Sequence, residues 1–358
     1  MQRWIEFNIH DRVKMRVARQ APTAAQMKDM FAPFISDDPV GSADLTVTGE
    51  LEPIVEGSYG EYEYEYTDDA LYMSDGNVQI VRHGDELRVN GTREMLTTVL
   101  PLVDRVATTR GAAMMHAAYV DYQGHGVCMP AWGGVGKTST VAKLLKIDDV
   151  GFMGDDWGFL TDDGRMLGYA KPMFIKPHHQ PIYPHLFADK RKPLVPSRLS
   201  KPIARLTTMV HPLVTQYPGV AGVVRKWSPE HMMHTPQEAF PGARISTNVP
   251  LDILMFVERF NASHVSLQET EESWMVSRLI GNFHTEMSLH SREVVVAMGA
   301  TGLVPIENFF NDKREVFQRA VAGKPTYLLR VPVSFPADQA SDVIVEHLHK
   351  AMADAGVL

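Results

Sequence analysis

The sequence predicts an α/β protein in two parts: a strand-rich α+β module over residues 1–100 and a larger α/β domain over residues 101–358. Two patterns carry this prediction. The first hundred residues contain many short stretches in which apolar and polar residues alternate, as they do along half-buried strands. After residue 112, apolar runs alternate with segments of helical periodicity, an order of elements typical of α/β domains. Residues 187–245 fit neither pattern and are expected to be an insertion.

The N-terminal module is expected to begin with a hairpin, in which residues 4–9 pair with residues 13–17. The segment that leads from this module into the larger domain, residues 94–109, has helical periodicity but contains Pro101. Proline removes a helical hydrogen bond, so we expect a kink or two shorter helices there. The remaining elements expected are strands at residues 44–48, 62–66, 70–73, 78–81 and 88–89, and a helix at residues 24–32.

One expected strand carries three tyrosines, Tyr62, Tyr64 and Tyr66, which alternate with glutamates. A period of two places the rings on one face and the acids on the other. We interpret this stripe as a half-buried strand with a solvated face. A docking surface for a basic partner is the alternative.

The larger domain is expected to contain strands and helices in alternation, with a Pro- and His-rich loop at residues 168–186. The strands are expected at residues 113–121, 125–129, 150–153, 251–258, 264–269 and 326–331. The helices are expected after Lys137 and at residues 198–210, 236–239, 271–283, 315–322 and 337–353.

Composition excludes several classes of protein. The 358 residues are 44% hydrophobic and 22% charged, which is ordinary for a globular chain with a real core. A net charge of −8 argues against a chain that binds nucleic acid through phosphate neutralisation. No apolar run has the ~20 residues of a membrane span, and the N-terminus lacks a signal-like apolar core. The single cysteine, Cys128, suits a reducing compartment, so we expect a cytoplasmic protein with no membrane partner.

The most informative segment is Ala131-Trp-Gly-Gly-Val-Gly-Lys-Thr138, between an apolar run and a helical one. Closely spaced glycines let consecutive backbone N–H groups turn toward one anion, and the helix start adds a positive dipole. Lys137 would neutralise phosphate charge and the Thr138 hydroxyl would ligate Mg²⁺. Ala131 stands where the usual pattern has glycine. The residues expected to bind a nucleotide are Gly133, Gly134, Val135, Gly136, Lys137, Thr138 and Ser139.

An acidic pair, Asp155-Asp156, ends an apolar strand eighteen and nineteen residues after Lys137. In a phosphate-loop fold, a neighbouring strand delivers a carboxylate to Mg²⁺ at its C-terminal end. Two adjacent acids permit one to hold the metal and the other to accept a proton from an attacking hydroxyl. Gly-Asp-Asp also suits a simple turn, which is the alternative.

A histidine, His116, lies on an expected strand twenty-one residues before Lys137. A lone histidine on an apolar strand is more often a core residue than a catalytic one. The combined spacing of His116, the loop and the acidic pair nevertheless resembles the catalytic domain of HPr kinase/phosphorylase, whose fold is similar to that of phosphoenolpyruvate carboxykinase. The resemblance covers about residues 112–160 and continues weakly through Lys171 and residues 251–283.

This resemblance implies an ATP- and Mg²⁺-dependent kinase with a hydroxyl acceptor on a protein, a peptide or a small molecule. It implies that Asp155 is the general base, that Asp156 and Thr138 lie at the metal, and that His116 and Lys137 complete the catalytic group. It also implies a homo-oligomer. The Glu-Ile-Arg-Gly signature of the dephosphorylating members is missing, so the resemblance is to a kinase-only relative.

The acceptor is not identified by the sequence. We expect it near Lys176, His178 and His179, and near the basic run that begins at Lys190. The alternatives to a hydroxyl kinase are a non-catalytic, nucleotide-gated binding protein and a carboxykinase-like enzyme. The second should place several arginines around the metal.

Overall fold

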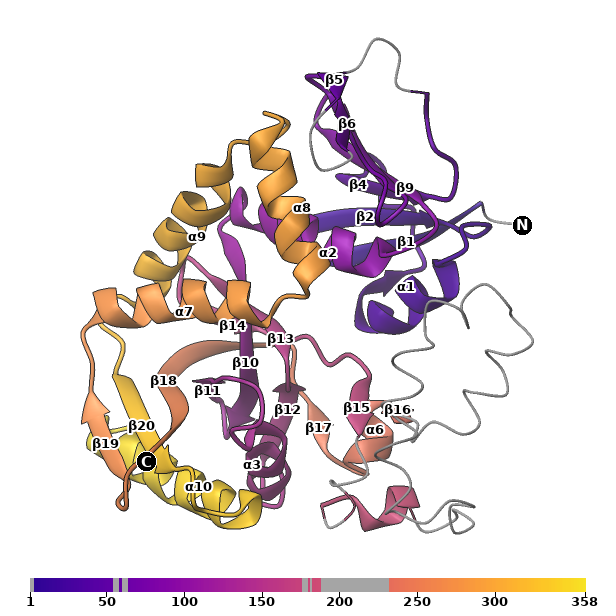
Figure 1. The fold of residues 1–358 in the computed structure, drawn as a ribbon. Helices are drawn as coiled ribbons and strands as arrows, with labels where there is room; N and C mark the ends of the chain where they lie inside the picture. Colours follow the sequence, from indigo (N-terminus) through magenta and orange to yellow (C-terminus); the bar gives the residue numbers. More distant parts are fainter. Residues whose placement is uncertain (1–2, 54–57, 60–63, 176–179, 181, 188–231) are drawn as a thin grey trace, which may run out of the picture. The chain divides into compact units, whose positions relative to one another are not determined.

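A computed structural model describes residues 3–53, 58–59, 64–175, 180, 182–187 and 232–358 (Figure 1). The chain divides into two compact units: Met1–Lys171 with Ala243–Leu358, and Pro172–Gly242. The first unit contains two mixed nine-stranded sheets with helices, so the predicted mixed α/β class is confirmed. In the second unit, β15 (Met173–Ile175) pairs with β16 (Met232–His234), and this unit also contains α6 (Pro236–Ala239) and a short 3₁₀ helix, Pro184–Phe187.

The first sheet is formed by the N-terminal module, in the order β3-β1-β2-β4-β9-β8-β7-β6-β5. The predicted hairpin is confirmed, because β1 and β2 pair antiparallel from Ile9–Val13 to Trp4–Ala18. Alternate residues of β1 are buried, as the period-two pattern predicts. The strands are β1 (Trp4–Ile9), β2 (Val13–Ala18), β3 (Ile35–Ser36), β4 (Leu45–Thr48), β5 (Ser58–Tyr59), β6 (Tyr64–Tyr66), β7 (Ala70–Met73), β8 (Val78–His83) and β9 (Glu86–Gly91).

The tyrosine stripe lies on β6. Tyr64 and Tyr66 are partly buried and pack against the core, which agrees with the interpretation of a half-buried strand. The Tyr64 hydroxyl donates to Glu293 Oε1 at 3.0 Å. Tyr62 lies outside the described residues.

We expected a kink or two shorter helices around Pro101, and the alternative of two shorter helices is wrong. Residues Met95–Thr108 form one helix, α2, with Pro101 in its interior. The proline leaves the carbonyl of Thr97, four residues earlier, without its usual helical donor. Ser291 Oγ donates to that carbonyl at 2.6 Å from a neighbouring helix, α8 (Leu289–Ala300). A tertiary hydrogen bond therefore replaces the missing one.

The second sheet is built around β10 (Ala112–Tyr122), whose eleven residues are all buried. β10 pairs with β11 (His125–Pro130) on one side. On its other side it pairs first with β13 (Trp157–Thr161) and then with β12 (Val150–Gly154). The remaining strands are β14 (Arg165–Leu167), β17 (Arg244–Ile245), β18 (Asn248–Phe260), β19 (Ser266–Glu269) and β20 (Thr326–Pro332).

The helices of this unit confirm most of the predicted ones. The helices are α1 (Ala24–Met30), α3 (Lys137–Leu144), α7 (Glu272–Glu286), α9 (Ile306–Val321) and α10 (Ala337–Asp354). Several elements were not predicted, and β15 lies within the segment 168–186 that was expected to be a loop. The elements not predicted are β3, β5, β13, β14, β15, β16, β17 and α8, and those predicted too short include β9 and α9. The exposed Leu289 and Val296 obscure the amphipathic pattern of α8. In α9, a charged residue at a core position, Lys313, interrupts the apolar periodicity.

That lysine belongs to a buried ion pair. Lys313 Nζ lies 2.8 Å from Asp104 Oδ2 on α2, and both side chains are almost fully buried. The pair also binds the backbone of β10, since Lys313 donates to Met114 O at 2.9 Å and Asp104 Oδ1 accepts from Met114 N at 2.8 Å. The ammonium lies 3.1 Å from the centroid of the Phe283 ring. Burial lowers the pKa of Lys313 to about 8, against the opposing charge of Asp104.

Replacing Lys313 by methionine should therefore destabilise the protein strongly. The change leaves the Asp104 carboxylate buried without its cation, and breaking a buried ion pair in this way costs about 3–5 kcal/mol. Urea unfolding of the Lys313→Met variant measures this loss. Adding Asp104→Asn should restore much of the lost stability, and a double variant no more stable than Lys313→Met would contradict this account.

A neutral histidine, His284, lies beside the pair on α7. Burial and the Lys313 charge lower its pKa to about 3. The unfolded chain therefore binds more protons than the folded one between pH ~6.5 and ~3, so stability falls as pH drops through this range.

We expect His284→Phe to reduce the acid sensitivity of the protein, because phenylalanine does not titrate and fits beside Phe310, whose ring lies 4.5 Å away. The histidine accounts for up to about 2 kcal/mol of the stability lost between about pH 7 and about pH 5. Urea unfolding of both proteins at the two pH values measures the difference. An equal loss in both proteins would show that His284 is not responsible.

Candidate functional site

The glycine-rich loop joins β11 to α3, in the strand–loop–helix context that the sequence predicts. Two of its glycines have left-handed backbones, with φ of 76° at Gly134 and 117° at Gly136. Residues with a Cβ atom rarely adopt this backbone conformation, so glycine is needed at both positions. Ala131 is fully buried and its backbone pairs with Val257. The loop and the first turn of α3 contain the predicted phosphate-binding residues Gly133, Gly134, Val135, Gly136, Lys137, Thr138 and Ser139.

Lys137 lies across its own loop. Its Nζ donates to the carbonyls of Ala131 and Trp132, at 2.8 and 3.2 Å. An ammonium has three N–H donors, so one is left for a further acceptor. Burial lowers the pKa of Lys137, and nearby carboxylates, Asp155 first among them, oppose that shift.

The acidic pair occupies the connection between β12 and β13, which both pair with β10. The two strands follow one another along the same side of β10, with the acidic pair between them. The pair is itself bonded to β10, because Asp156 O accepts from Ala117 N at 3.0 Å. Gly154 next to it is closely packed, since a Cβ there would lie 3.0 Å from Trp157 O.

Asp155 faces the loop. Its Oδ2 accepts from the Thr138 hydroxyl at 2.6 Å. Its Oδ1 is buried and has no hydrogen-bond partner among the described residues. Burial and the charge of Asp156 raise the pKa of Asp155 to about 7. An oxygen in this position can accept a hydrogen bond, a proton or a cation.

Asp156 has a different environment. Lys171 Nζ donates to its Oδ2 at 2.7 Å, and the lysine is almost fully buried whereas the aspartate side chain is 43% exposed. Burial alone would raise the pKa of Asp156, but Lys171, His116 and Lys137 outweigh it and lower the pKa. Thr138 thus contacts Asp155, although Asp156 was its expected partner at the metal.

His116 lies on β10, close to Asp156 of the acidic pair and to Glu286 at the end of α7. Its Nε2 is 3.9 Å from Asp156 Oδ1 and 4.0 Å from Oε2 of Glu286. Burial and the charge of Lys137 lower the pKa of His116 to about 3, so the ring is neutral near neutral pH. Its Nδ1 is buried and has no partner among the described residues.

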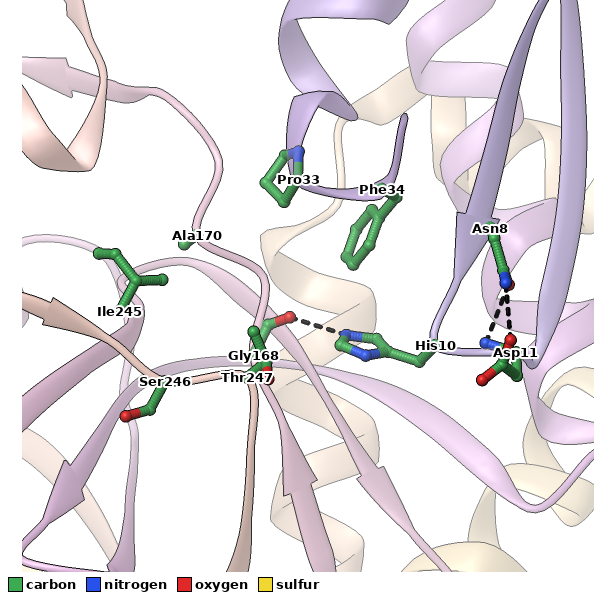
Figure 2. A pocket seen from close by; sticks show the side chains of 10 residues that line it. All are labelled: Asn8, His10, Asp11, Pro33, Phe34, Gly168, Ala170, Ile245, Ser246 and Thr247. Atoms are coloured by element: carbon green, nitrogen blue, oxygen red, sulfur yellow. Dashed lines mark hydrogen bonds between the residues drawn. The ribbon is translucent and has the colours of Figure 1, made fainter. Parts of the chain in front are cut away.

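The N-terminal module holds the segment that carries Lys171. His10 Nε2 donates to the carbonyl of Gly168 at 2.8 Å (Figure 2). The Tyr169 hydroxyl donates to Met30 O at 2.9 Å, and its ring stacks on that of Phe31. A cavity of about 220 Å³ lies beside the His10 contact, bordered by Phe34 and Ser246 (Figure 2). Residues distant in sequence therefore fix the main chain just before Lys171.

Glu286, the last residue of α7, joins the site without having been predicted. Its Oε1 accepts from the backbone N–H of Gly133 at 2.9 Å. Nothing in the local sequence indicates this contact, because α7 is far from the loop along the chain. Its position becomes clear only from the packing of α7 on β10, where Asn282 Nδ2 donates to His116 O at 2.8 Å.

The structure thus brings His116, Lys137, Thr138, Asp155 and Asp156 together. The expected acceptor residues Lys176, His178 and His179 lie outside the described residues, as do the basic run beginning at Lys190 and the helix expected at residues 198–210. Within the described ranges, no helix has the length and apolar character needed to cross a membrane. In the same part of the chain, no three His, Cys, Asp or Glu side chains are grouped so as to bind a metal by themselves.

Comparison with known proteins adds no assignment. No protein-family model matches the chain, and no curated protein matches it.

Proposed function

We propose that the chain is an ATP-dependent kinase that transfers the γ-phosphoryl group to a hydroxyl. The observation that carries this proposal is the position of Asp155: one carboxylate oxygen accepts from Thr138 of the loop, and the other is buried with no partner in the part of the chain that the structure describes. A simple turn would not need a buried, half-satisfied carboxylate beside a phosphate-binding loop, because an unpaired buried acceptor is costly.

The residues present fit a nucleotide with Mg²⁺. The left-handed glycines and the helix start provide backbone N–H groups for phosphates, and Lys137 has a free donor. Mg²⁺ usually binds to one or two protein carboxylates and to substrate phosphates, so a larger cluster of ligands is not required. Thr138 and Asp156, with Asp155 adjacent, are the residues proposed to hold it. When bound, Mg²⁺ supplies charge neutralisation on the phosphates.

The roles of the other residues follow from their surroundings. Asp155 Oδ1 would accept the proton of the acceptor hydroxyl, and a pKa near neutrality suits a general base. Lys137 would neutralise phosphate charge. Lys171 keeps Asp156 ionised, which favours a metal-binding role for that carboxylate. The neutral His116 would place an uncharged ring near Asp156 and Glu286 without adding charge beside the transferring group.

The spacing of these residues supports a fold similar to the HPr kinase and phosphoenolpyruvate carboxykinase group, and the same resemblance implies a homo-oligomer. The missing Glu-Ile-Arg-Gly signature supports a kinase-only protein, and the single cysteine supports a cytoplasmic one. The acceptor hydroxyl would belong to a protein, a peptide or a small molecule. The carboxykinase-like alternative is less favoured. Among the described residues, the cations that contact the acidic pair or the loop carbonyls are lysines, Lys137 and Lys171, and not the arginines that an oxaloacetate-type anion would require.

The test is phosphoryl transfer from γ-labelled ATP by the full chain, with panels of serine-containing peptides and small alcohols as acceptors. We expect label in an acceptor and release of ADP, and both should be lost when EDTA removes Mg²⁺. ATP binding without transfer to any acceptor would favour the nucleotide-gated binding protein. Absence of ATP binding would refute the proposal.

A further inference from the structure

The carboxylate of Glu286 is hydrogen-bonded to a backbone N–H group of the loop that could otherwise bind a phosphate. Its Oε1 accepts from Gly133 N at 2.9 Å. A backbone N–H has one hydrogen and makes one good hydrogen bond at a time. A carboxylate and a phosphate are the same kind of partner for it, because both present anionic oxygens. A phosphate cannot use this N–H fully while Glu286 holds it.

Helix stability does not explain an acid in this place. Glu286 is the last residue of α7, where the helix dipole is negative and disfavours a negative side chain. The helix end is fixed, because the next residue, Met287, is buried and Asn282 one turn earlier is bonded to His116 O. The carboxylate is therefore presented to the loop by a rigid element, and its compensating contact is the one with Gly133.

The carboxylate also lies on the catalytic side of the loop. Its Oε2 is 4.0 Å from His116 Nε2, which in turn is 3.9 Å from Asp156 Oδ1. In the proposed reaction the terminal phosphate must lie on this side, because the proposed general base, Asp155, and the proposed Mg²⁺ ligand, Asp156, are there.

We propose that Glu286 occupies the place of the terminal phosphate in the nucleotide-free chain and is a specificity-determining residue, which weakens the binding of a nucleoside triphosphate relative to a diphosphate. This inference rests on the proposed nucleotide site. Triphosphate binding must displace the carboxylate, whereas a diphosphate leaves its place untouched. Glu286 thereby opposes tight retention of the triphosphate.

The experiment compares Glu286→Gln and Glu286→Ala with the wild-type chain by calorimetric titration of a non-hydrolysable ATP analogue and of ADP, both with Mg²⁺. The matched control is Glu272→Gln. Glu272 lies at the other end of α7 and accepts from the Gly323 backbone N–H at 2.7 Å, so its replacement removes the same charge and weakens a similar hydrogen bond far from the loop.

We expect Glu286→Ala to bind the triphosphate analogue about tenfold more tightly, since no carboxylate competes for Gly133 N–H. Glu286→Gln should tighten binding in the same direction by a smaller factor, because its neutral amide oxygen still accepts from that N–H. ADP affinity should change by less than about threefold, and the control should match the wild type. Unchanged or weaker triphosphate binding would overturn the inference, as would equal tightening for both nucleotides. If neither the wild type nor any variant binds either nucleotide, the proposed function itself fails. Binding by all four proteins with equal affinities would refute the Glu286 inference alone.

Discussion

Lys137→Ala is expected to abolish phosphoryl transfer and to weaken ATP binding by about 10- to 100-fold. The lysine is the cation within the loop, and one charged hydrogen bond contributes about 1.5–3 kcal/mol, which corresponds to that range of affinity. The variant also loses the bonds from Nζ to the carbonyls of Ala131 and Trp132, so thermal unfolding should be measured beside the affinity.

The matched control for this change is Lys143→Ala on the same helix. Lys143 Nζ binds Asp342 at 2.5 Å and Asp338, both on α10, and neither contact is with the loop itself. Its loss should affect stability slightly and nucleotide affinity not at all. A folded Lys137→Ala protein with wild-type ATP affinity and turnover would remove the basis for a phosphate site in the loop.

Asp155→Asn is expected to reduce turnover by about 10²–10⁴-fold, the range typical for loss of a general base. The amide keeps the shape of the side chain and still offers an oxygen to the Thr138 hydroxyl, so ATP affinity should remain within a few-fold of the wild type. Single-turnover transfer and equilibrium binding separate the two quantities. Wild-type turnover would show that the acidic pair has a structural role only.

Asp156→Asn should act differently, by raising the Mg²⁺ concentration needed for half-maximal turnover. The variant weakens the proposed metal site and removes the negative charge that pairs with Lys171. Titration with Mg²⁺ should recover much of the activity of Asp156→Asn and none of that of Asp155→Asn. If Mg²⁺ instead rescues Asp155→Asn, the two carboxylates have exchanged roles, which would accord with the contact between Asp155 and Thr138.

Much of the fold could be predicted because its signals are local. The hairpin of β1 and β2, the loop before α3 and the strand before Asp155 each depend on turn residues or on a repeat within about ten residues. Where such signals are broken, prediction failed. The chain resumes as β13 immediately after the acidic pair, which looks like the end of a strand in the sequence.

By itself, the sequence determined that a glycine-rich loop, an acidic pair and a strand histidine exist at a characteristic spacing. Only the tertiary structure decided how they are used. In the folded chain Asp155 accepts a hydrogen bond from Thr138, and Asp156 accepts one from Lys171. Glu286 of α7 accepts one from the backbone N–H of Gly133. The tertiary structure also lets Ser291 replace the hydrogen bond that Pro101 removes. The reason is that hydrogen bonds and charge pairs between distant segments depend on how helices and strands pack, and no local pattern records that packing.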